Sequence, residues 1–252
     1  DKGARLYGHI VVDEAQGMTA MQWRALSRRC PSGSFTIVGD LGQASTRAAP
    51  ESWEQALEEV RTRALVRTTE LTVNYRTPSE VMELAARVLA EAAPALTPPR
   101  SVRESGFDPV IERAEPDNLD SSVVAATRSE REALGDGKIA VIVPEDEIAR
   151  LAELLAAPSA GERSLTTPEA RALLDAPLSV LGLDAARGLE FDSVILVEPS
   201  RLVAEHAQGL RALYVALTRT TRRLRIVYSR DLPQSLTPAP SAAEAGKAQP
   251  AE

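Results

Sequence analysis

The chain has 252 residues, of which 44% are hydrophobic, enough for one large or two small domains with a buried core. Its formal net charge of -7 and its pI near 5.1 disfavour a free-standing nucleic-acid binder, because basic side chains that neutralise phosphates supply most of the affinity of such proteins. A single cysteine excludes an internal disulfide, and no apolar run approaches the ~20 residues of a membrane helix, so we expect a cytoplasmic protein without signal peptide or membrane segment.

Residues 1–68 predict part of an α/β domain. Apolar, β-branched runs at 7–12 and 34–38 indicate two buried strands, and helical spacing of apolar residues over 18–30 indicates a helix between them. A strand, helix, strand unit of this length implies parallel pairing with a right-handed crossover. Because two strands do not complete a doubly wound sheet, we expect a fragment with an exposed sheet edge or a partner against it; a helical pattern then runs from Pro50 to Val60.

Residues 69–230 predict a second, complete α/β domain with a parallel sheet flanked by helices, because strand and helix patterns alternate throughout. Strands are predicted at 70–73, 109–113, 138–143, 178–181, 194–197 and 224–228. Helices are predicted from Pro78 to Pro94, at 119–134, at 146–157 and directly ahead of Arg219, while 164–176 is helical or irregular. Residues 231–252 are rich in Ala, Pro and Ser and are expected to form a disordered tail.

Two polar motifs stand at the carboxyl ends of the first domain's strands, where open α/β sheets bind ligands. Asp13 can hold a magnesium ion through its water shell, and the adjacent Glu14 can orient or deprotonate an attacking water. Gly39 and Asp40 end the second strand, with Gln43 three residues further on. An Asp-Glu pair can also simply end a strand. Asp13 and Glu14 therefore indicate a functional site only together with Gly39, Asp40 and Gln43.

Three further motifs lie in the second domain. Tyr75 offers an aromatic face that can stack on a base, and the neighbouring Arg76 suits a phosphate. A tight turn at Gly188 presents Glu190, whose carboxylate can accept hydrogen bonds from a ribose, and Arg219 ends an apolar helical pattern that leads into a strand. Taken singly, Tyr75 could be an interfacial residue at a helix start, and Arg219 a solvated side chain near a helix end.

The five motifs in this order resemble the motif series of UvrD/Rep-type superfamily 1 helicases, beginning at its second motif; they lie at 11–16, 38–43, 74–76, 188–197 and 213–219. The resemblance covers about residues 7–230. It implies the RecA-like P-loop NTPase fold, with one complete RecA-like domain and a fragment of another. It also implies ATP and Mg²⁺ as ligands.

The resemblance gives each matching position a role. It implies that Glu14 activates the water, that Gln43 senses the γ-phosphate and that Arg219 is an arginine finger, which can be worth ~10³–10⁵ in rate. The metal position is Asp13, and the nucleotide-binding positions are Tyr75 at the adenine, Arg76 at the γ-phosphate, and Gly188 with Glu190 at the ribose. We therefore expect Arg76 and Arg219 to face the same cleft as Glu14.

Two departures from the family weaken the expected grip on DNA. In the family, aromatic residues that stack on bases follow the motif that here lies at 38–43. They are missing in this chain, where Thr46, Ala48 and Ala49 occupy that segment. Stacking is worth ~1–3 kcal/mol per base. Gly182 and Asp184 stand where processive helicases have Thr and His, and an Asp repels a phosphate where a His would bind one.

Other departures point to one branch of the family. The ~105 residues between Arg76 and Gly182 are all consumed by the core of the second domain, so the large subdomain inserted in UvrD and Rep is lacking. Arg187 replaces the usual Lys and changes the donor geometry. This combination resembles the HelD branch of helicase-like ATPases, which associate with RNA polymerase. The implied partners are RNA polymerase and/or DNA, the latter bound weakly through this half, together with an N-terminal part of the same protein.

The sequence contains no P-loop. Gly137-Lys138 and Gly246-Lys247 lack both the preceding Gly and the following Ser or Thr of the Gly-x4-Gly-Lys-Ser/Thr pattern. We therefore expect the chain to be the C-terminal part of a larger ATPase and to be inactive alone. Three functions stay open: a HelD-like ATPase that acts on RNA polymerase or transcription complexes, a UvrD/Rep-type 3'-5' DNA helicase in repair, and a binding module that does not hydrolyse ATP.

Overall fold

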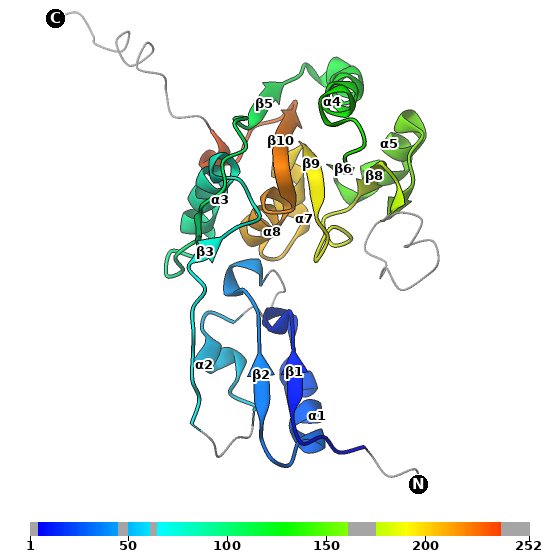
Figure 1. The fold of residues 1–252 in the computed structure, drawn as a ribbon. Helices are drawn as coiled ribbons and strands as arrows, with labels where there is room; N and C mark the ends of the chain where they lie inside the picture. The colour runs from blue at the N-terminus through cyan, green and yellow to red at the C-terminus, as the bar shows by residue number, and fades with distance from the viewer. Residues whose placement is uncertain (1–4, 45–49, 61–64, 161–174, 238–252) are drawn as a thin grey trace, which may run out of the picture.

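The computed structural model describes residues 5–44, 50–60, 65–160 and 175–237, which form two lobes (Figure 1). In the smaller lobe, β1 (Ile10–Val12) pairs in parallel with β2 (Phe35–Ile37), and α1 (Ala20–Arg29) connects the two strands. The predicted strand, helix, strand unit is confirmed. The helical pattern after Pro50 was overextended, since α2 (Trp53–Ala56) ends within one turn.

A capping box starts α1 and fixes how it meets the sheet. The Thr19 hydroxyl accepts a hydrogen bond from the Gln22 amide, and the Gln22 side chain accepts one from the Thr19 amide, so two otherwise unpaired amides are satisfied. The helix then buries Trp23 against Val12 and Ala15, which forms the small core of this lobe. Among the described strands β2 has β1 as its only neighbour, and Val11 is exposed, as expected for a sheet fragment.

The larger lobe contains a six-stranded, wholly parallel sheet in the order β5-β10-β9-β6-β8-β7 (Figure 1). Its strands are β5 (Val110–Arg113), β6 (Ile139–Ile142), β7 (Ser159–Ala160), β8 (Leu178–Leu181), β9 (Phe191–Val197) and β10 (Thr220–Tyr228). The central strands are buried on both faces, which explains why they read as continuous apolar runs rather than as alternating ones. The predicted α/β fold with a parallel sheet flanked by helices is confirmed.

Helices cover both faces of this sheet. The helices are α3 (Ser79–Ala92), α4 (Leu119–Leu134), α5 (Ile148–Leu155), α7 (Pro199–Glu205) and α8 (Gly209–Leu217). Along β9, Val194 and Leu196 pack with α3, α7 and α8, whereas Ile195 and Val197 pack with α4 and α5, because successive side chains of a strand point to opposite faces. Within the described part of the chain, no helix is both long and apolar enough to cross a membrane.

Several segments differ from the sequence-based prediction. The strand expected at 70–73 is β3 (Val73–Asn74), which pairs with β4 (Arg100–Ser101) in a separate two-stranded ribbon and does not join the main sheet. Both strands are two residues long, too short to give a periodic signal. Helix α7 and strand β7 were not predicted, and most of the predicted 164–176 segment lies outside the described residues.

The second domain extends beyond its expected end at residue 230. The short 3-10 helix Gln234–Leu236 places Leu236 in the core beside α3, with none of its surface exposed. Arg87 of α3 also donates a hydrogen bond to the carbonyl of Thr237 (3.2 Å). A tail that begins at residue 231 is therefore wrong for residues 231–237, because one buried leucine is enough to hold this turn; residues 238–252 lie outside the described part.

A buried carboxylate fixes α4 to the sheet. Glu130 is 1% exposed and accepts hydrogen bonds from Ser193 of β9 (3.0 Å) and from Arg223 (2.8 Å) and Arg225 (3.3 Å) of β10. The Arg223 guanidinium lies 4.3 Å from the centre of the Phe107 ring, which shields this side of the cluster.

Replacing Glu130 by Ala should lower the free energy of unfolding by about 3–5 kcal/mol, because two arginines would stay packed on the sheet without their carboxylate. Urea denaturation followed by circular dichroism measures this. Glu132→Ala, at an exposed position of the same helix, is the matched control and should change stability by less than about 0.5 kcal/mol. Equal small losses in both variants would contradict the assignment.

Candidate functional site

The carboxylate of Glu14 is held rigidly where β1 ends. Glu14 adopts the left-handed conformation (φ 52°, ψ 38°), which is costly for a residue with a side chain. Its amide donates to Asp13 Oδ1 (2.8 Å), and its Oε2 accepts a hydrogen bond from Gln16 Nε2 (2.6 Å). These two contacts offset the backbone strain and fix the carboxylate at the end of the strand.

Gln16 joins the ends of the two strands. Its side chain is buried, and its Oε1 accepts a hydrogen bond from the Asp40 amide (3.1 Å) after β2. The chain passes very close here, because a Cβ atom at Gly39 would lie 2.5 Å from Gln16 Oε1 and 2.8 Å from the Trp53 ring. Gly39 is therefore required for the two strand ends to meet.

A chain of hydrogen bonds crosses from the first lobe to the second. Asp40 Oδ1 accepts from the Gly42 amide (2.8 Å), and its Oδ2 accepts from Gln43 Nε2 (2.9 Å). Gln43 Oε1 in turn accepts a hydrogen bond from Arg219 Nη2 (2.9 Å). The motifs at 38–43 and 213–219 thus meet directly, through two residues that are 176 positions apart in the sequence.

Arg219 is a buried cation whose hydrogen bonds go to neutral oxygens. It is 4% exposed, and its Nε donates to the carbonyl of Val215 (3.1 Å) in the preceding turn of α8. Burial lowers the pKa of Arg219, and the Glu14 carboxylate acts in the opposite direction, while Arg76 lowers it further and Glu190 raises it. A buried guanidinium without a directly bonded carboxylate among its described partners favours an anion nearby.

Arg76 and Glu190 lie close to Arg219, and Tyr75 precedes Arg76 in the chain; we refer to these three as the rim residues. The Asn74 side chain accepts hydrogen bonds from the amides of Arg76 (2.7 Å) and Thr77 (3.0 Å), which turns the chain after β3. Arg76 Nε forms an ion pair with Glu190 Oε1 (2.9 Å), and both groups act electrostatically on Arg219. Tyr75 is 75% exposed, so its ring is free to take part in stacking.

A pocket of about 220 Å³ takes its walls from both lobes. The first lobe contributes Glu14 and Gln43, and the second contributes Arg187, Gly188 and Val215. Arg219, Arg76, Tyr75 and Glu190 are not among its lining residues. The expectation that Arg76 and Arg219 face the same cleft as Glu14 therefore stays a prediction.

The turn that carries Gly188 is built around an ion pair. Gly188 has a φ of +69°, a conformation that favours glycine. Arg187 Nη2 contacts Asp184 Oδ1 at 2.6 Å, so these two side chains neutralise each other within the turn. His206 Nε2, from the end of α7, lies 3.9 Å from Asp184 Oδ2. Nothing in the sequence linked His206 to this turn, because the contact depends on how α7 packs.

Asp13 is suited to be one ligand of a magnesium ion. Mg²⁺ usually keeps several waters and takes only one or two protein carboxylates besides substrate phosphates. Asp13 lies at the carboxyl end of β1 beside the pocket residue Glu14, which fits such a role. Among the described residues, no group of three or more His, Cys, Asp or Glu side chains is arranged to hold a metal by itself.

A larger pocket, of about 400 Å³, lies along the free side of β2. Phe35, Ile37 and Trp53 form one side of it, and the connecting segment 65–69 forms the other. None of the predicted catalytic or nucleotide-binding residues lines it. We therefore place the candidate site at the smaller pocket, where charged groups of both lobes converge.

Comparisons with known proteins agree with the second half of the motif series. Residues 178–227, which span β8 to β10 and include Gly188, Glu190 and Arg219, match the family model of the UvrD-like helicase C-terminal domain. A search of curated proteins gives no match. Among solved structures, the chain is similar to the C-terminal domain of a possible DNA helicase from Lactobacillus plantarum WCFS1, with 17% identity, a TM-score of 0.47, and coverage of 65% of this chain and 92% of that one.

Gly39→Ala should lower the free energy of unfolding by about 1–3 kcal/mol, because the added methyl group displaces Gln16 or Trp53 from the strand ends. Urea denaturation provides the measurement. Gly8→Ala is the control, since its added Cβ meets nothing within 4 Å, and it should stay within about 0.5 kcal/mol of the unmodified chain. A Gly39→Ala chain as stable as the control would refute the close approach.

Proposed function

We propose that the chain is the C-terminal part of a UvrD-like superfamily 1 ATPase whose hydrolytic site is the pocket between the two lobes. The observation that carries this proposal is the hydrogen bond from the buried Arg219 to Gln43, beside the fixed carboxylate of Glu14. Those three side chains come from separate motifs and from both lobes. Their convergence is what hydrolysis at a domain interface requires.

The residues divide the work of phosphoryl transfer. Glu14 accepts a proton from, or orients, the attacking water, and Arg219 stabilises the charge that develops on the transferring phosphoryl group. Gln43, bonded to Arg219, links the first lobe to that charge. Asp13 would hold a magnesium ion through its water shell, and the ion would supply positive charge that neutralises the phosphates.

The rim residues hold the nucleotide in this proposal. The exposed Tyr75 ring stacks on the adenine, and Glu190 takes the ribose at the turn that begins with Gly188. Arg76 leaves Glu190 to reach the γ-phosphate. Their ion pair is about half exposed on each side, so breaking it costs at most about 1 kcal/mol.

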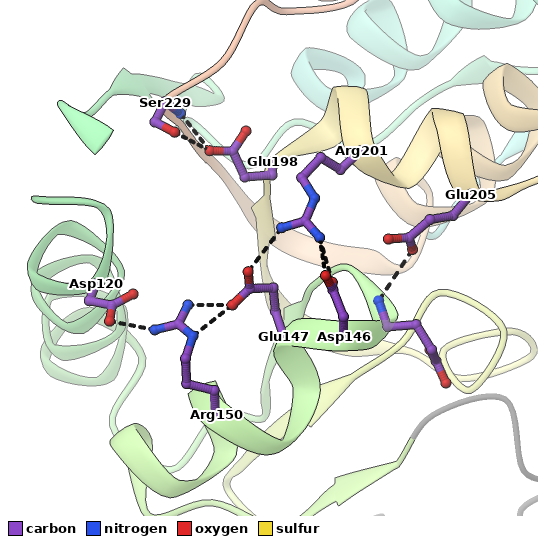
Figure 2. A network of polar contacts seen from close by, with 9 residues as sticks. Asp120, Asp146, Glu147, Arg150, Glu198, Arg201, Glu205 and Ser229 are labelled. Atoms are coloured by element: carbon purple, nitrogen blue, oxygen red, sulfur yellow. Dashed lines mark hydrogen bonds and ion pairs between the residues drawn. The ribbon is translucent and has the colours of Figure 1, made fainter. Parts of the chain in front are cut away.

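We further propose that the parent protein belongs to the HelD-like branch and acts on RNA polymerase or transcription complexes rather than gripping DNA through this domain. Asp184 supports this, because its carboxylate occupies the position at which processive helicases have a His. Arg150 of α5 and Arg201 of α7, which follow β6 and β9, support it too, since both are held in ion pairs within the lobe (Figure 2). Thr46, Ala48 and Ala49 lie outside the described residues and rest on the sequence alone.

The sequence leaves two alternatives. A UvrD/Rep-type 3'-5' repair helicase would use the same hydrolytic residues but needs another surface to hold the single strand. A non-hydrolysing binding module would keep the fold and use the nucleotide only as a conformational switch. The Arg219 to Gln43 contact favours hydrolysis, because a binding module has no need of a buried cation shared between the two lobes.

Hydrolysis by the full-length protein should depend on both lobes. Glu14→Gln and Arg219→Ala should each lower kcat by about 10³-fold, because one removes the base and the other the charge that stabilises the transition state. Arg222→Ala, at an exposed position three residues beyond Arg219, should leave the rate nearly unchanged. The isolated 252-residue chain should not hydrolyse ATP. ATP hydrolysis by the isolated chain that Glu14→Gln abolishes would contradict this prediction, because it would mean that these residues contain a complete hydrolytic site.

The response to partners should separate the HelD-like function from the repair helicase. ATP hydrolysis by the full-length protein should respond little to single-stranded DNA and rise when RNA polymerase is added. Asp184→His, combined with aromatic residues at positions 46 and 48, should strengthen the response to DNA. Robust ATP-dependent unwinding of a tailed duplex by the unmodified protein would instead establish the repair-helicase alternative.

A further inference from the structure

Helix α8 contacts the first lobe near both of its ends. At its carboxyl end Arg219 donates to Gln43, as described above. In its first turn Arg211 Nη1 lies within hydrogen-bond distance of the carbonyl oxygens of Ala44 (3.3 Å) and Pro50 (3.5 Å). Ala44 directly follows the motif at 38–43, and Pro50 lies further along the chain. Arg211 therefore holds these two positions close to one point of α8.

The chemistry of Arg211 differs from that of an arginine placed for stability. Arg211 is 7% exposed, yet it forms no ion pair within the part of the chain that the structure describes, and its buried Nε has no hydrogen-bond partner there. Arg201, on the neighbouring helix α7, is also largely buried but is neutralised by Asp146 and Glu147 (Figure 2). A guanidinium that gives up solvent for carbonyl oxygens alone is better explained by the position that it fixes.

The geometry of α8 ties this contact to the pocket. Arg211 and Arg219 are eight residues apart, roughly 12 Å along the helix axis, and both face the first lobe. Between them Val215 lines the pocket, and the Tyr214 ring lies so close to Gly42 that a Cβ atom there would be 3.3 Å from it. Helix α8 and the Arg219 that follows it therefore contact three successive residues of the first lobe, namely Gly42, Gln43 and Ala44.

We propose that Arg211 is a positioning residue for hydrolysis: it holds Ala44 and Pro50 against α8 and thereby sets Gln43 where Arg219 meets it. This inference rests on the proposed function, since it assumes that Gln43 and Arg219 act on the γ-phosphate. Arg211 itself does not line the pocket and does not touch the nucleotide. Its effect is exerted through Gln43.

The test uses the full-length protein and steady-state ATP hydrolysis. Arg211→Ala should lower kcat by roughly tenfold or more with little change in KM for ATP, because a small misplacement of a catalytic group costs up to about a hundredfold in rate while the binding residues stay intact. Arg201→Ala is the matched control, a largely buried arginine on the adjacent helix whose contacts stay within the second lobe. It should reduce thermal stability but not kcat.

A double variant separates positioning from a general loss of structure. Arg211→Ala combined with Gln43→Ala should be no slower than Gln43→Ala alone, because the arginine acts only through that glutamine. Arg211→Lys, which keeps a donor and a charge, should recover part of the lost kcat and carries the test if the alanine variant does not fold. Additive losses in the double variant, or equal losses in Arg211→Ala and Arg201→Ala, would overturn the inference.

Failure of the inference and failure of the proposed function give different results. If Glu14→Gln abolishes hydrolysis while Arg211→Ala behaves like the control, only the positioning role is wrong. If the unmodified full-length protein does not hydrolyse ATP, the proposed function is wrong and the inference falls with it.

Discussion

The contact between Arg219 and Gln43 is the interaction on which the candidate site depends. It places a buried positive charge where motifs of the two lobes meet through a hydrogen bond. A cation in that position is expensive unless an anion compensates it. The Glu14 carboxylate supplies part of that compensation, and a bound phosphate would supply the rest. The cost of burying this charge is the reason for the catalytic role proposed for Arg219.

The two sheets position the site by different means. In the second lobe the parallel sheet is covered on both faces, so α8 is fixed by packing with α3 and α7 and delivers Arg219 at its end. The described residues of the first lobe form a sheet of two strands, and the strand ends are held by Gln16 and by the close approach at Gly39 instead. Hydrogen bonds of side chains thus replace, locally, the rigidity that a wider sheet would give.

The carboxyl edge of the second sheet has a different character from the pocket. There Arg150 is paired with Asp120 and Glu147, and Arg201 with Asp146 and Glu147 (Figure 2). Affinity for nucleic acids depends on basic groups that are free to meet phosphates. Arg150 and Arg201 are therefore not free for such contacts, which is consistent with the weak DNA contact proposed above.

The local pattern of apolar residues was sufficient to predict helices of several turns and buried strands. Helix α4 and strand β8 have the predicted bounds, and the apolar stripe from Val81 to Leu89 is buried as expected. The motif order also placed Glu14, Gln43 and Arg219 in one series before any fold was known. The two-residue strands β4 and β7 and the turn that buries Leu236 were missed, since each depends on a few long-range contacts.

The sequence by itself therefore determined the fold class, and it predicted the division into two α/β units and the residues of one site, because these follow from periodicity and from motif spacing. Only the tertiary structure decided which side chains touch. It joined Arg219 to Gln43, set Arg211 on the carbonyls of Ala44 and Pro50, and brought His206 towards Asp184. The physical reason is that such contacts arise from the packing of α7 and α8 against the rest of the molecule, and no local pattern in the chain encodes that packing.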